Sequence, residues 1–371
     1  MNEAEIRARD AFRDHFGRDA AGVSFAPGRV NLIGEHVDYN EGLVLPMGLE
    51  QGTAVAWAPR DDRKARVWAA DYEQHDRFDV DGVRAWSSVD WRQYVRGVFA
   101  MLPAQGIAVH GVDLVIAGTL PRGAGLSSSA SLTVATARAI AAAQGSRAPV
   151  LEIARAAQAA ERRFAGVRCG IMDPLASAAA RPGHATLIDC RSLAVSAIRL
   201  PAEWQVLIIE SGIERTLVDG EYNARRSQCE AAAVALGVAS LRDASLATIE
   251  AARELDPTLR RRARHVVGEI ARTAACAQAM RKGDLATFGR LLREGQRSLR
   301  EDFETSLPEI DRLVATLDEA VGPEGGARMT GAGFGGAIVV VCHRSREPIA
   351  ARVLAEMPAK VISSCRIWNL G

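Results

Sequence analysis

Residues 111–145 constrain the fold more than any other stretch of the chain. They read "GVDLVIAGTLPRGAGLSSSASLTVATARAIAAAQG": an apolar strand, a glycine-rich turn and an alanine-rich helix, which we expect to end near Gly145. Gly123 and Gly125 allow the backbone to approach an anion closely, and the helix start presents free N–H groups and the positive end of its dipole. The segment predicts a phosphate-binding turn. The alternative is a tight turn before a serine-capped helix.

A lysine is missing from this turn, although a Walker A loop requires one before its serine or threonine. Residues 123–129 contain only glycine, alanine, leucine and serine. Nucleotide binding here would depend on backbone N–H groups, on the helix dipole and on the hydroxyl groups of Ser127, Ser128 and Ser129. These hydroxyl groups can donate to phosphate oxygens or coordinate magnesium.

A second glycine-rich segment, "GAGFGG" at 331–336, formally matches the dinucleotide-binding pattern GxGxxG. That pattern must follow a strand and open a helix. Here the next residues are "AIVVVCH", which read as a strand, so the sequence excludes a dehydrogenase of this type. The glycines suit either close backbone approach to a ligand or a tight turn at a sheet edge.

The length of 371 residues exceeds the usual size of a single core, so we expect two domains. The pattern of elements restarts around Pro201 with the buried strand "WQVLIIES", and helices dominate from about 222 to 320. We place the domain boundary between 180 and 200. The mixed order of helices and strands favours an α+β fold over a doubly wound sheet.

Charge and cysteine usage exclude several classes of protein. The 46 basic and 45 acidic residues give a formal net charge of +1, which argues against a dedicated nucleic-acid surface. The six cysteines form no CxxC pair, and no secretory leader or apolar run of ~18 residues is present, so we expect a cytoplasmic protein without a membrane span. The seven histidines show no zinc-ligand spacing.

Two acidic residues stand out by position. On a helical projection of 150–165, Glu161 lies inside the apolar stripe. A buried carboxylate needs a partner, which could be an arginine of a neighbouring element or a metal ion. Asp173, in "CGIMDPLASAAA", is followed by Pro174, a pair typical of a helix N-cap and first turn. Capping and a functional role are compatible for Asp173.

Residues 28–40, "GRVNLIGEHVDYN", concentrate hydrogen-bonding side chains in one short segment. Taken singly, Asn31 is most often a turn residue and His36 most often a satisfied histidine. Together with Arg29, Glu35 and Asp38 they are harder to explain structurally. A sugar carries several hydroxyl groups in fixed directions, and each needs a partner when it loses water. The crowding therefore indicates a polyhydroxyl ligand.

With these motifs in place, the chain resembles the galactokinases, members of the GHMP small-molecule kinases. The stretches "GRVNLIGEHVDYNEGLVLP", "LPRGAGLSSSASL", "CGIMD" and "RMTGAGFGGA" occur in the order and spacing of that family. The resemblance implies a two-domain α+β fold with the active site in the cleft between the domains. The N-terminal domain, residues 1–190, would be a mixed α/β domain like domain 2 of ribosomal protein S5. The C-terminal domain, 191–371, would be a ferredoxin-like α+β domain.

The resemblance also implies a reaction: a monomeric enzyme would transfer the γ-phosphoryl group of ATP, with Mg²⁺, to the anomeric hydroxyl of D-galactose. Asp173 would accept or orient the sugar's proton, and Arg29 would keep Asp173 ionised and stabilise charge in the transfer. Ser129 and Glu161 would hold magnesium. The phosphates would be wrapped by Gly123, Ala124, Gly125, Leu126, Ser127, Ser128 and Ser129. The sugar would be contacted by Glu35, His36, Asp38, Gly170 and Tyr222.

Four positions depart from the common family pattern. Val37 replaces a threonine, Pro174 a glutamine, Thr133 a frequent glutamate and Gln296 a histidine. We expect Pro174 to restrain Asp173 from the helical region, and the first two changes bear on sugar preference. Alternatives are a kinase for another galacto-configured sugar, such as N-acetylgalactosamine or L-arabinose, a non-catalytic sugar sensor, and a mevalonate- or homoserine-type kinase. The complete "GLSSSAS" disfavours the sensor, and "GEHVDYN" disfavours the last group.

Overall fold

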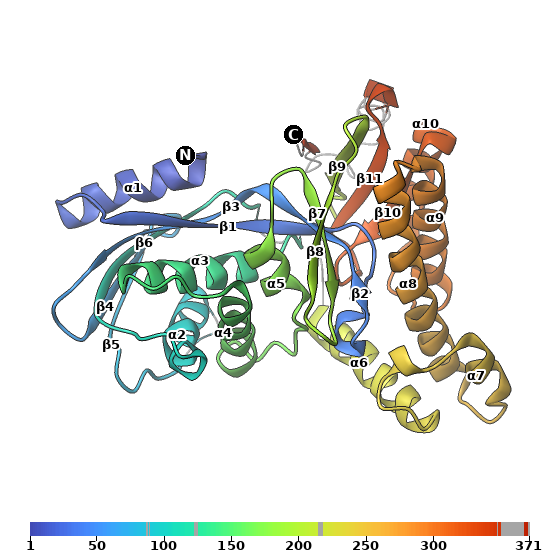
Figure 1. Ribbon diagram of the computed structural model, residues 1–371, viewed down its shortest axis with the longest axis horizontal. Coiled ribbons are helices and arrows are strands. Elements are labelled where there is room, and N and C mark those ends of the chain that lie inside the picture. Colours follow the sequence, from blue (N-terminus) through green and yellow to red (C-terminus); the bar gives the residue numbers. More distant parts are fainter. Residues whose placement is uncertain are drawn as a thin grey trace. The chain divides into compact units, whose positions relative to one another are not determined.

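The computed structural model describes residues 1–86, 88, 90–121, 125–213, 218–346, 348–349 and 367–369. The chain forms two compact units, and each is discontinuous in sequence (Figure 1). Unit 1 consists of Met1–Arg29, Gly48–Arg122 and Ser127–Ala180. Unit 2 consists of Val30–Met47, Gly123–Leu126 and Arg181–Gly371. The early segment 30–47 therefore folds with the C-terminal half of the chain.

Unit 1 is a sheet with helices on both faces. Its elements are α1 (Glu3–Phe16), β1 (Gly22–Asn31), β3 (Pro46–Pro59), β4 (Lys64–Ala69), β5 (Gln74–Asp79), α2 (Trp91–Met101), β6 (Val112–Gly118), α3 (Ser128–Ala143), α4 (Val150–Arg163) and α5 (Met172–Ala179). The strands run in the order β1-β3-β6-β4-β5. All pairings in the run from β3 to β5 are antiparallel except β4 with β6.

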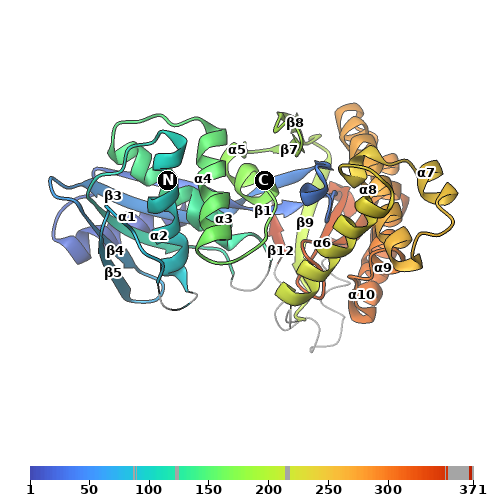
Figure 2. The same ribbon diagram turned by 90° about the horizontal axis from the view of Figure 1, so that it is seen from below.

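The two faces of this sheet are covered by different helices. Helix α1 packs its Ala4, Ala8 and Phe12 against Val115 and Ala117 of β6. Helices α2, α3 and α4 pack on one another, on the other side of the sheet from α1 (Figures 1 and 2). Asn2 caps helix α1 with its side chain, and Gly17 ends the helix in the left-handed region.

Unit 2 contains the remaining elements. They are β2 (Leu43–Val44), β7 (His184–Asp189), β8 (Val195–Arg199), β9 (Trp204–Glu210), α6 (Val218–Ala235), α7 (Leu246–Ala251), α8 (Pro257–Lys282), α9 (Leu285–Glu301), α10 (Pro308–Val321), β10 (Gly325–Thr330), β11 (Ala337–His343) and β12 (Ile367–Asn369). The strands β10-β11-β9-β12 form a fully antiparallel sheet. Strands β2 and β8 pair with β7.

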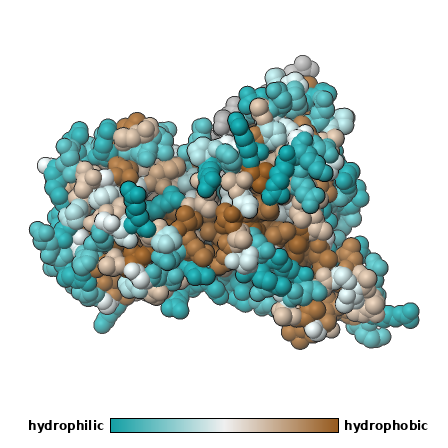
Figure 3. Space-filling model, viewed as in Figure 1, coloured by the Kyte–Doolittle hydropathy of each residue, from teal (hydrophilic) through white to brown (hydrophobic). Residues whose placement is uncertain are grey.

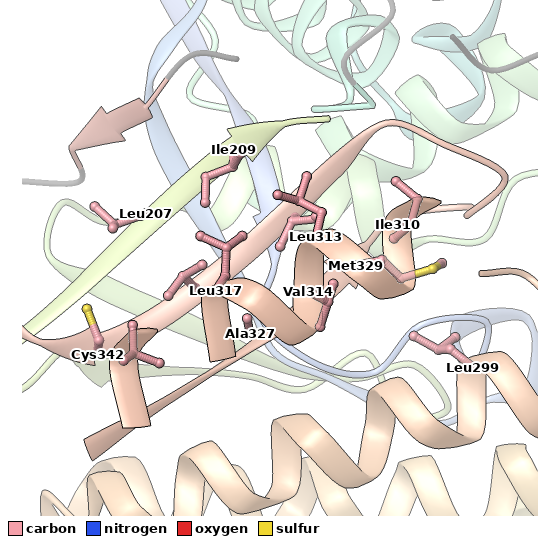
Figure 4. Close-up of a cluster of buried hydrophobic side chains, with 13 residues drawn as sticks. Leu207, Ile209, Leu299, Ile310, Leu313, Val314, Leu317, Ala327, Met329 and Cys342 are labelled. Atoms are coloured by element: carbon pink, nitrogen blue, oxygen red, sulfur yellow. The ribbon is translucent and has the colours of Figure 1, made fainter. Parts of the chain in front are cut away.

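One face of the β10-β11-β9-β12 sheet carries a core of unit 2 (Figure 4). Leu207 and Ile209 of β9 meet Leu313 and Leu317 of α10, and Met329 of β10 joins them. Side chains alternate along a strand, so the neighbours of Met329, Arg328 and Thr330, belong to the opposite face of β10. Both are buried, and they enter the site described below.

None of the helices in the described residues combines the length and apolar character needed to cross a bilayer. On the surface, apolar residues gather over α6 and α7 at the lower right of Figure 3, and Val234 of α6 and Leu246 of α7 are exposed. Apolar side chains make up part of every protein surface, so we assign these residues no function.

Candidate active site

The serine-rich turn leads into helix α3, whose first residue is Ser128. Gly125 has φ +73°, and the N-cap Ser127 also lies in the left-handed region, at φ +57°. The Ser127 side chain makes no capping hydrogen bond to the helix, so the alternative of a serine-capped helix start does not hold at Ser127. Gly123 and Ala124, two residues of the predicted phosphate-binding turn, lie outside the described residues.

The Ser127 hydroxyl instead donates to Oδ2 of Asp173 at 2.6 Å. Arg29, at the end of the unit 1 part of β1, binds the same carboxylate through two parallel hydrogen bonds, Nε to Oδ1 at 2.8 Å and Nη2 to Oδ2 at 2.7 Å. Arg29 is buried, whereas the Asp173 side chain is 29% exposed. Three elements that are distant in sequence thus fix one partly accessible carboxylate.

The sequence suggested that Asp173 is the N-cap of its helix, and the structure shows that it is not. The cap is Ile171, and Asp173 is the second residue of the helix. Pro174 does not keep Asp173 out of the helical region either. A proline in the first turn is tolerated because the N–H groups there have no partner within the helix. Gly170 lies half-buried immediately before α5.

Glu161 is buried on helix α4, as its place in the apolar stripe predicted, with only 3% of its surface exposed. Its carboxylate accepts from the Ser129 hydroxyl at 3.3 Å and from the Thr133 hydroxyl at 3.4 Å. Burial raises the pKa of Glu161 to about 7, and the charge of Asp173 adds to the rise. Among the described residues no arginine or lysine pairs with Glu161.

A cavity of about 700 Å³ lies in unit 1 next to the start of α3. Ser128, Ser129 and Leu132 line it together with aromatic side chains. The aromatic residues are Tyr72, Trp91 and Tyr94. Sequence reasoning missed this cavity. The i, i+3 spacing of Trp91 and Tyr94 at the start of an amphipathic helix was the available signal.

The motif "GEHVDYN" lies in unit 2. Glu35 is 1% exposed, and both of its carboxylate oxygens are occupied by protein donors. Oε2 accepts from Arg328 Nη2 at 2.6 Å, and Oε1 accepts from the Thr330 hydroxyl at 3.1 Å and the Gly331 N–H at 3.2 Å. Burial raises the pKa of Glu35, while the charge of Arg328 opposes that rise.

His36 is also buried, at φ +60°. Its Nε2 lies 3.1 Å from the Ala332 carbonyl oxygen and its Nδ1 lies 2.9 Å from the Tyr39 hydroxyl oxygen. Because a carbonyl can only accept, Nε2 carries the proton and Nδ1 accepts from Tyr39 in the neutral ring. The imidazole also packs on Tyr222, with ring centroids 5.4 Å apart.

Asp38 begins a single 3-10 turn, Asp38–Asn40, which Glu41 ends in the left-handed region. Arg242 holds this turn: its Nη1 donates to the Glu41 carbonyl oxygen at 2.6 Å, and its two terminal nitrogens bind the Asp189 carboxylate at 2.5 and 2.8 Å. Val37 is completely buried beside the turn. The segment is therefore fixed from several elements of unit 2.

The second glycine-rich segment connects β10 to β11, as predicted from its context. The strands are antiparallel, with Thr330 opposite Ala337. Positive φ values occur at Gly331, Gly333, Phe334, Gly335 and Gly336. Four of these five residues are glycines, which accept such angles without steric cost.

The predicted residues therefore fall into two groups. Unit 1 brings together Arg29, Ser127, Ser129, Glu161 and Asp173. Unit 2 brings together Glu35, His36 and Tyr222 around the loop at 331–336 and holds Asp38 in a fixed turn. Sequence reasoning missed Arg328 and Glu269. Both are charged residues at buried positions of their elements, and Glu269 shares the buried side of α8 with Val266 and Thr273.

Three family models match the chain. The galactokinase galactose-binding signature covers residues 10–59, the N-terminal domain of the GHMP kinases covers 93–181, and the GHMP kinase C-terminal model covers 276–360. The fit of a GHMP kinase N-terminal model to the region of α2–α5 agrees with the serine-rich turn found there.

Solved structures agree with these models. The galactokinase of Lactococcus lactis, solved with galactose, is 30% identical with a TM-score of 0.88, over 97% of this chain and 96% of that one. The mevalonate kinase of Methanococcus jannaschii is 18% identical with a TM-score of 0.64, over 94% and 97%. The phosphomevalonate kinase of Streptococcus pneumoniae is 12% identical with a TM-score of 0.66, over 94% and 99%. The last two share the fold, and with the first they confirm the two-domain α+β GHMP kinase fold. The chain therefore belongs to the galactokinases of the GHMP kinase family.

Proposed function

We propose that this galactokinase transfers the γ-phosphoryl group of ATP to the anomeric hydroxyl of D-galactose and releases galactose 1-phosphate and ADP. The observation that carries this proposal is the Asp173 carboxylate, held by buried Arg29 and by Ser127 of the serine-rich turn. The Asp173 carboxylate can accept a proton, and it is hydrogen-bonded to the turn that is suited to phosphate. Phosphoryl transfer depends on such positioning more than on covalent chemistry.

Asp173 is our candidate for the group that receives or orients the proton of the sugar hydroxyl. Among the described residues its Oδ1 accepts one hydrogen bond, from Arg29, so this oxygen retains capacity for another donor. As the sugar oxygen attacks the γ-phosphorus, its proton would pass to Asp173 and the bond to the bridging oxygen of ADP would break. The positive charge of Arg29 lies beside the Asp173 carboxylate. There it would stabilise the negative charge that develops during phosphoryl transfer.

Mg²⁺ fits the oxygen donors of Ser129 and Glu161. Magnesium prefers hard oxygen ligands and is usually held by one or two carboxylates together with substrate phosphates. The remaining ligands would come from ATP. When bound there, the ion would neutralise phosphate charge.

The cavity beside α3 is our candidate for the nucleotide base. Its volume of about 700 Å³ suits a small ligand, and the aromatic lining residues Trp91 and Tyr94 suit a flat heterocycle. Ser128 and Ser129 line the same cavity. A base in this cavity would therefore place its phosphates at the N-terminus of α3, where N–H groups and the helix dipole favour anions.

For the sugar, we propose contacts from His36, Asp38, Gly170 and Tyr222, together with Glu35, whose surroundings are treated below. The family resemblance supports these assignments, and so does the density of polar groups in the segment 35–38. We further propose a cytoplasmic monomer with two small-molecule substrates, built from consecutive domains at 1–190 and 191–371.

An ATP-coupled screen across aldoses and amino sugars, with mass detection of the sugar 1-phosphate, tests the proposal. We expect galactose to be turned over with the highest kcat/KM. Equal or better turnover of N-acetylgalactosamine or L-arabinose would overturn the choice of galactose. Galactose binding without any transfer would indicate a sugar sensor.

A further inference from the structure

A chain of buried charges runs through unit 2, from Glu35 to Arg328 to Glu269. Arg328 Nη2 binds Glu35 at 2.6 Å, and its Nη1 binds Glu269 of α8 at 2.8 Å. Arg328 and Glu269 are fully buried. Glu269 also accepts from Arg272 at 2.9 Å and from the Gly34 N–H at 3.1 Å. Arg328 is therefore paired with two carboxylates, and Glu269 with two arginines.

The backbone makes room for this group. Gly295 lies in the interior of α9, where glycine is less favourable than alanine. A Cβ atom at this position would lie 2.7 Å from Arg328 Nη1. The helix thus carries an intrinsically unfavourable residue where the guanidinium passes.

Glu35 and its neighbour His36 also bind the start of the loop 331–336. Glu35 accepts from the Thr330 hydroxyl and the Gly331 N–H at the first end of the loop, and His36 reaches the Ala332 carbonyl. The single hydroxyl proton of Thr330 is shared between Glu35 and the Asn31 carbonyl oxygen, which lies 2.7 Å from Oγ1. The start of the loop is thus tied to two consecutive residues of the segment "GEHVDYN".

Stability alone is a weak reason for such a group. A buried ion pair is often no more stable than well-packed apolar side chains of similar volume, because the charges lose their hydration. A loop with five positive φ angles, by contrast, has many alternative conformations available to its glycines. A directional, fully paired anchor restricts those alternatives.

We propose that Arg328, held by Glu269, is a positioning residue of the phosphoryl-transfer reaction. It orients the Glu35 carboxylate, which in turn fixes Thr330 and Gly331 and so sets the conformation of the loop 331–336. Arg328 itself touches no substrate, since it is completely buried. This inference rests on the proposed function for its kinetic consequence and on unit 2 alone for its structural part.

Thr330→Val tests the anchor without leaving a buried charge unpaired. It removes the hydroxyl that joins Glu35 to the loop, and Thr330→Ser restores that hydroxyl. Thr316→Val, on the exposed face of α10, is the matched control for the same chemical change. Arg328→Lys, which keeps one charge but cannot bind two carboxylates in the same fork geometry, tests the guanidinium directly.

Two measurements are required on each variant. Hydrogen exchange, followed by mass spectrometry of peptides covering 329–337, reports on the loop without substrate. Steady-state kinetics separates kcat from the KM of each substrate. We expect Thr330→Val and Arg328→Lys to speed exchange of the loop and to lower kcat by about 10- to 100-fold, the size expected for losing a buried hydrogen bond to a charged group. The KM for ATP should change less than twofold, and Thr330→Ser should restore kcat.

Unchanged loop exchange, or a kcat per folded molecule equal to that of Thr316→Val, would overturn the inference. A fall in melting temperature with normal kcat would do the same, because it would show a structural role only. Failure of the wild-type protein to phosphorylate any sugar would instead overturn the proposed function. In that case the exchange measurement still decides whether the anchor holds the loop.

Discussion

Glu161→Gln should stabilise the protein in alkaline solution while impairing its use of magnesium. The Glu161 carboxyl has a pKa of about 7 in the folded chain, against an ordinary value of 4.5. The folded state therefore binds this proton more tightly than the unfolded state, and stability falls as pH rises from 4.5 through 7. The difference corresponds to about 3 kcal/mol above pH 7. A neutral glutamine avoids this penalty and still offers an acceptor to Ser129 and Thr133.

Urea unfolding at pH 4.5 and pH 8.5 measures the effect. We expect Glu161→Gln and wild type to unfold with similar free energies at pH 4.5, and the variant to be more stable by about 3 kcal/mol at pH 8.5. Glu152→Gln, in the first turn of the same helix, is the control and should change the free energy of unfolding by less than about 0.5 kcal/mol. Equal or lower stability of Glu161→Gln at pH 8.5 would refute the raised pKa of the buried Glu161 carboxyl.

The same variant tests the magnesium assignment. With saturating ATP and galactose, the Mg²⁺ concentration that gives half-maximal rate should rise sharply in Glu161→Gln, because a carboxylate ligand is lost. A titration curve that superimposes on that of wild type would remove Glu161 from the metal site.

Other predictions concern the remaining parts of the site. Asp173→Asn should abolish phosphoryl transfer and leave galactose binding by calorimetry largely intact; near-normal turnover would exclude the proposed role. Tyr94→Leu should raise the KM for ATP about tenfold through loss of ring stacking, with little change for galactose; Tyr94→Phe is its control, and an unchanged KM would move the base elsewhere. Arg242→Ala should raise the KM for galactose several-fold because Asp189 and Glu41 lose their shared partner, and unaltered sugar kinetics would show that the turn holds without it.

Local signals in the sequence were sufficient for much of the fold. The alanine-rich helix after the serine turn and the strand after the loop at 331–336 both depend on neighbours within a few residues. Glu161 was correctly expected to be buried, because helical periodicity places a residue relative to its own helix. The domain boundary near 190 stays a prediction, since the compact units are discontinuous in sequence.

Partners that come from distant segments could not be found in this way. Thr133 had no interpretation from sequence, yet its hydroxyl reaches Glu161 on another helix. Gln296 likewise accepts from the Met329 N–H and donates to Asp311. Asp173 was expected to cap a helix, but Arg29 and Ser127 take its oxygens. In each case the hydrogen-bond partner comes from a segment distant in sequence, and local sequence preference does not identify it.

The long separation between Glu35 and Arg328 also has a consequence for biosynthesis. The two residues are 293 positions apart, and Thr330 lies 299 positions after Asn31. At translation rates of ~5–20 residues per second, the segment 30–47 emerges from the ribosome about 15–60 s before its partners. During that interval the polar groups of this segment are hydrogen-bonded to water, because their protein partners have not yet been synthesised. We therefore expect that in nascent chains that stop before strand β10 the segment 30–47 is not in its native conformation, even where unit 1 has already folded.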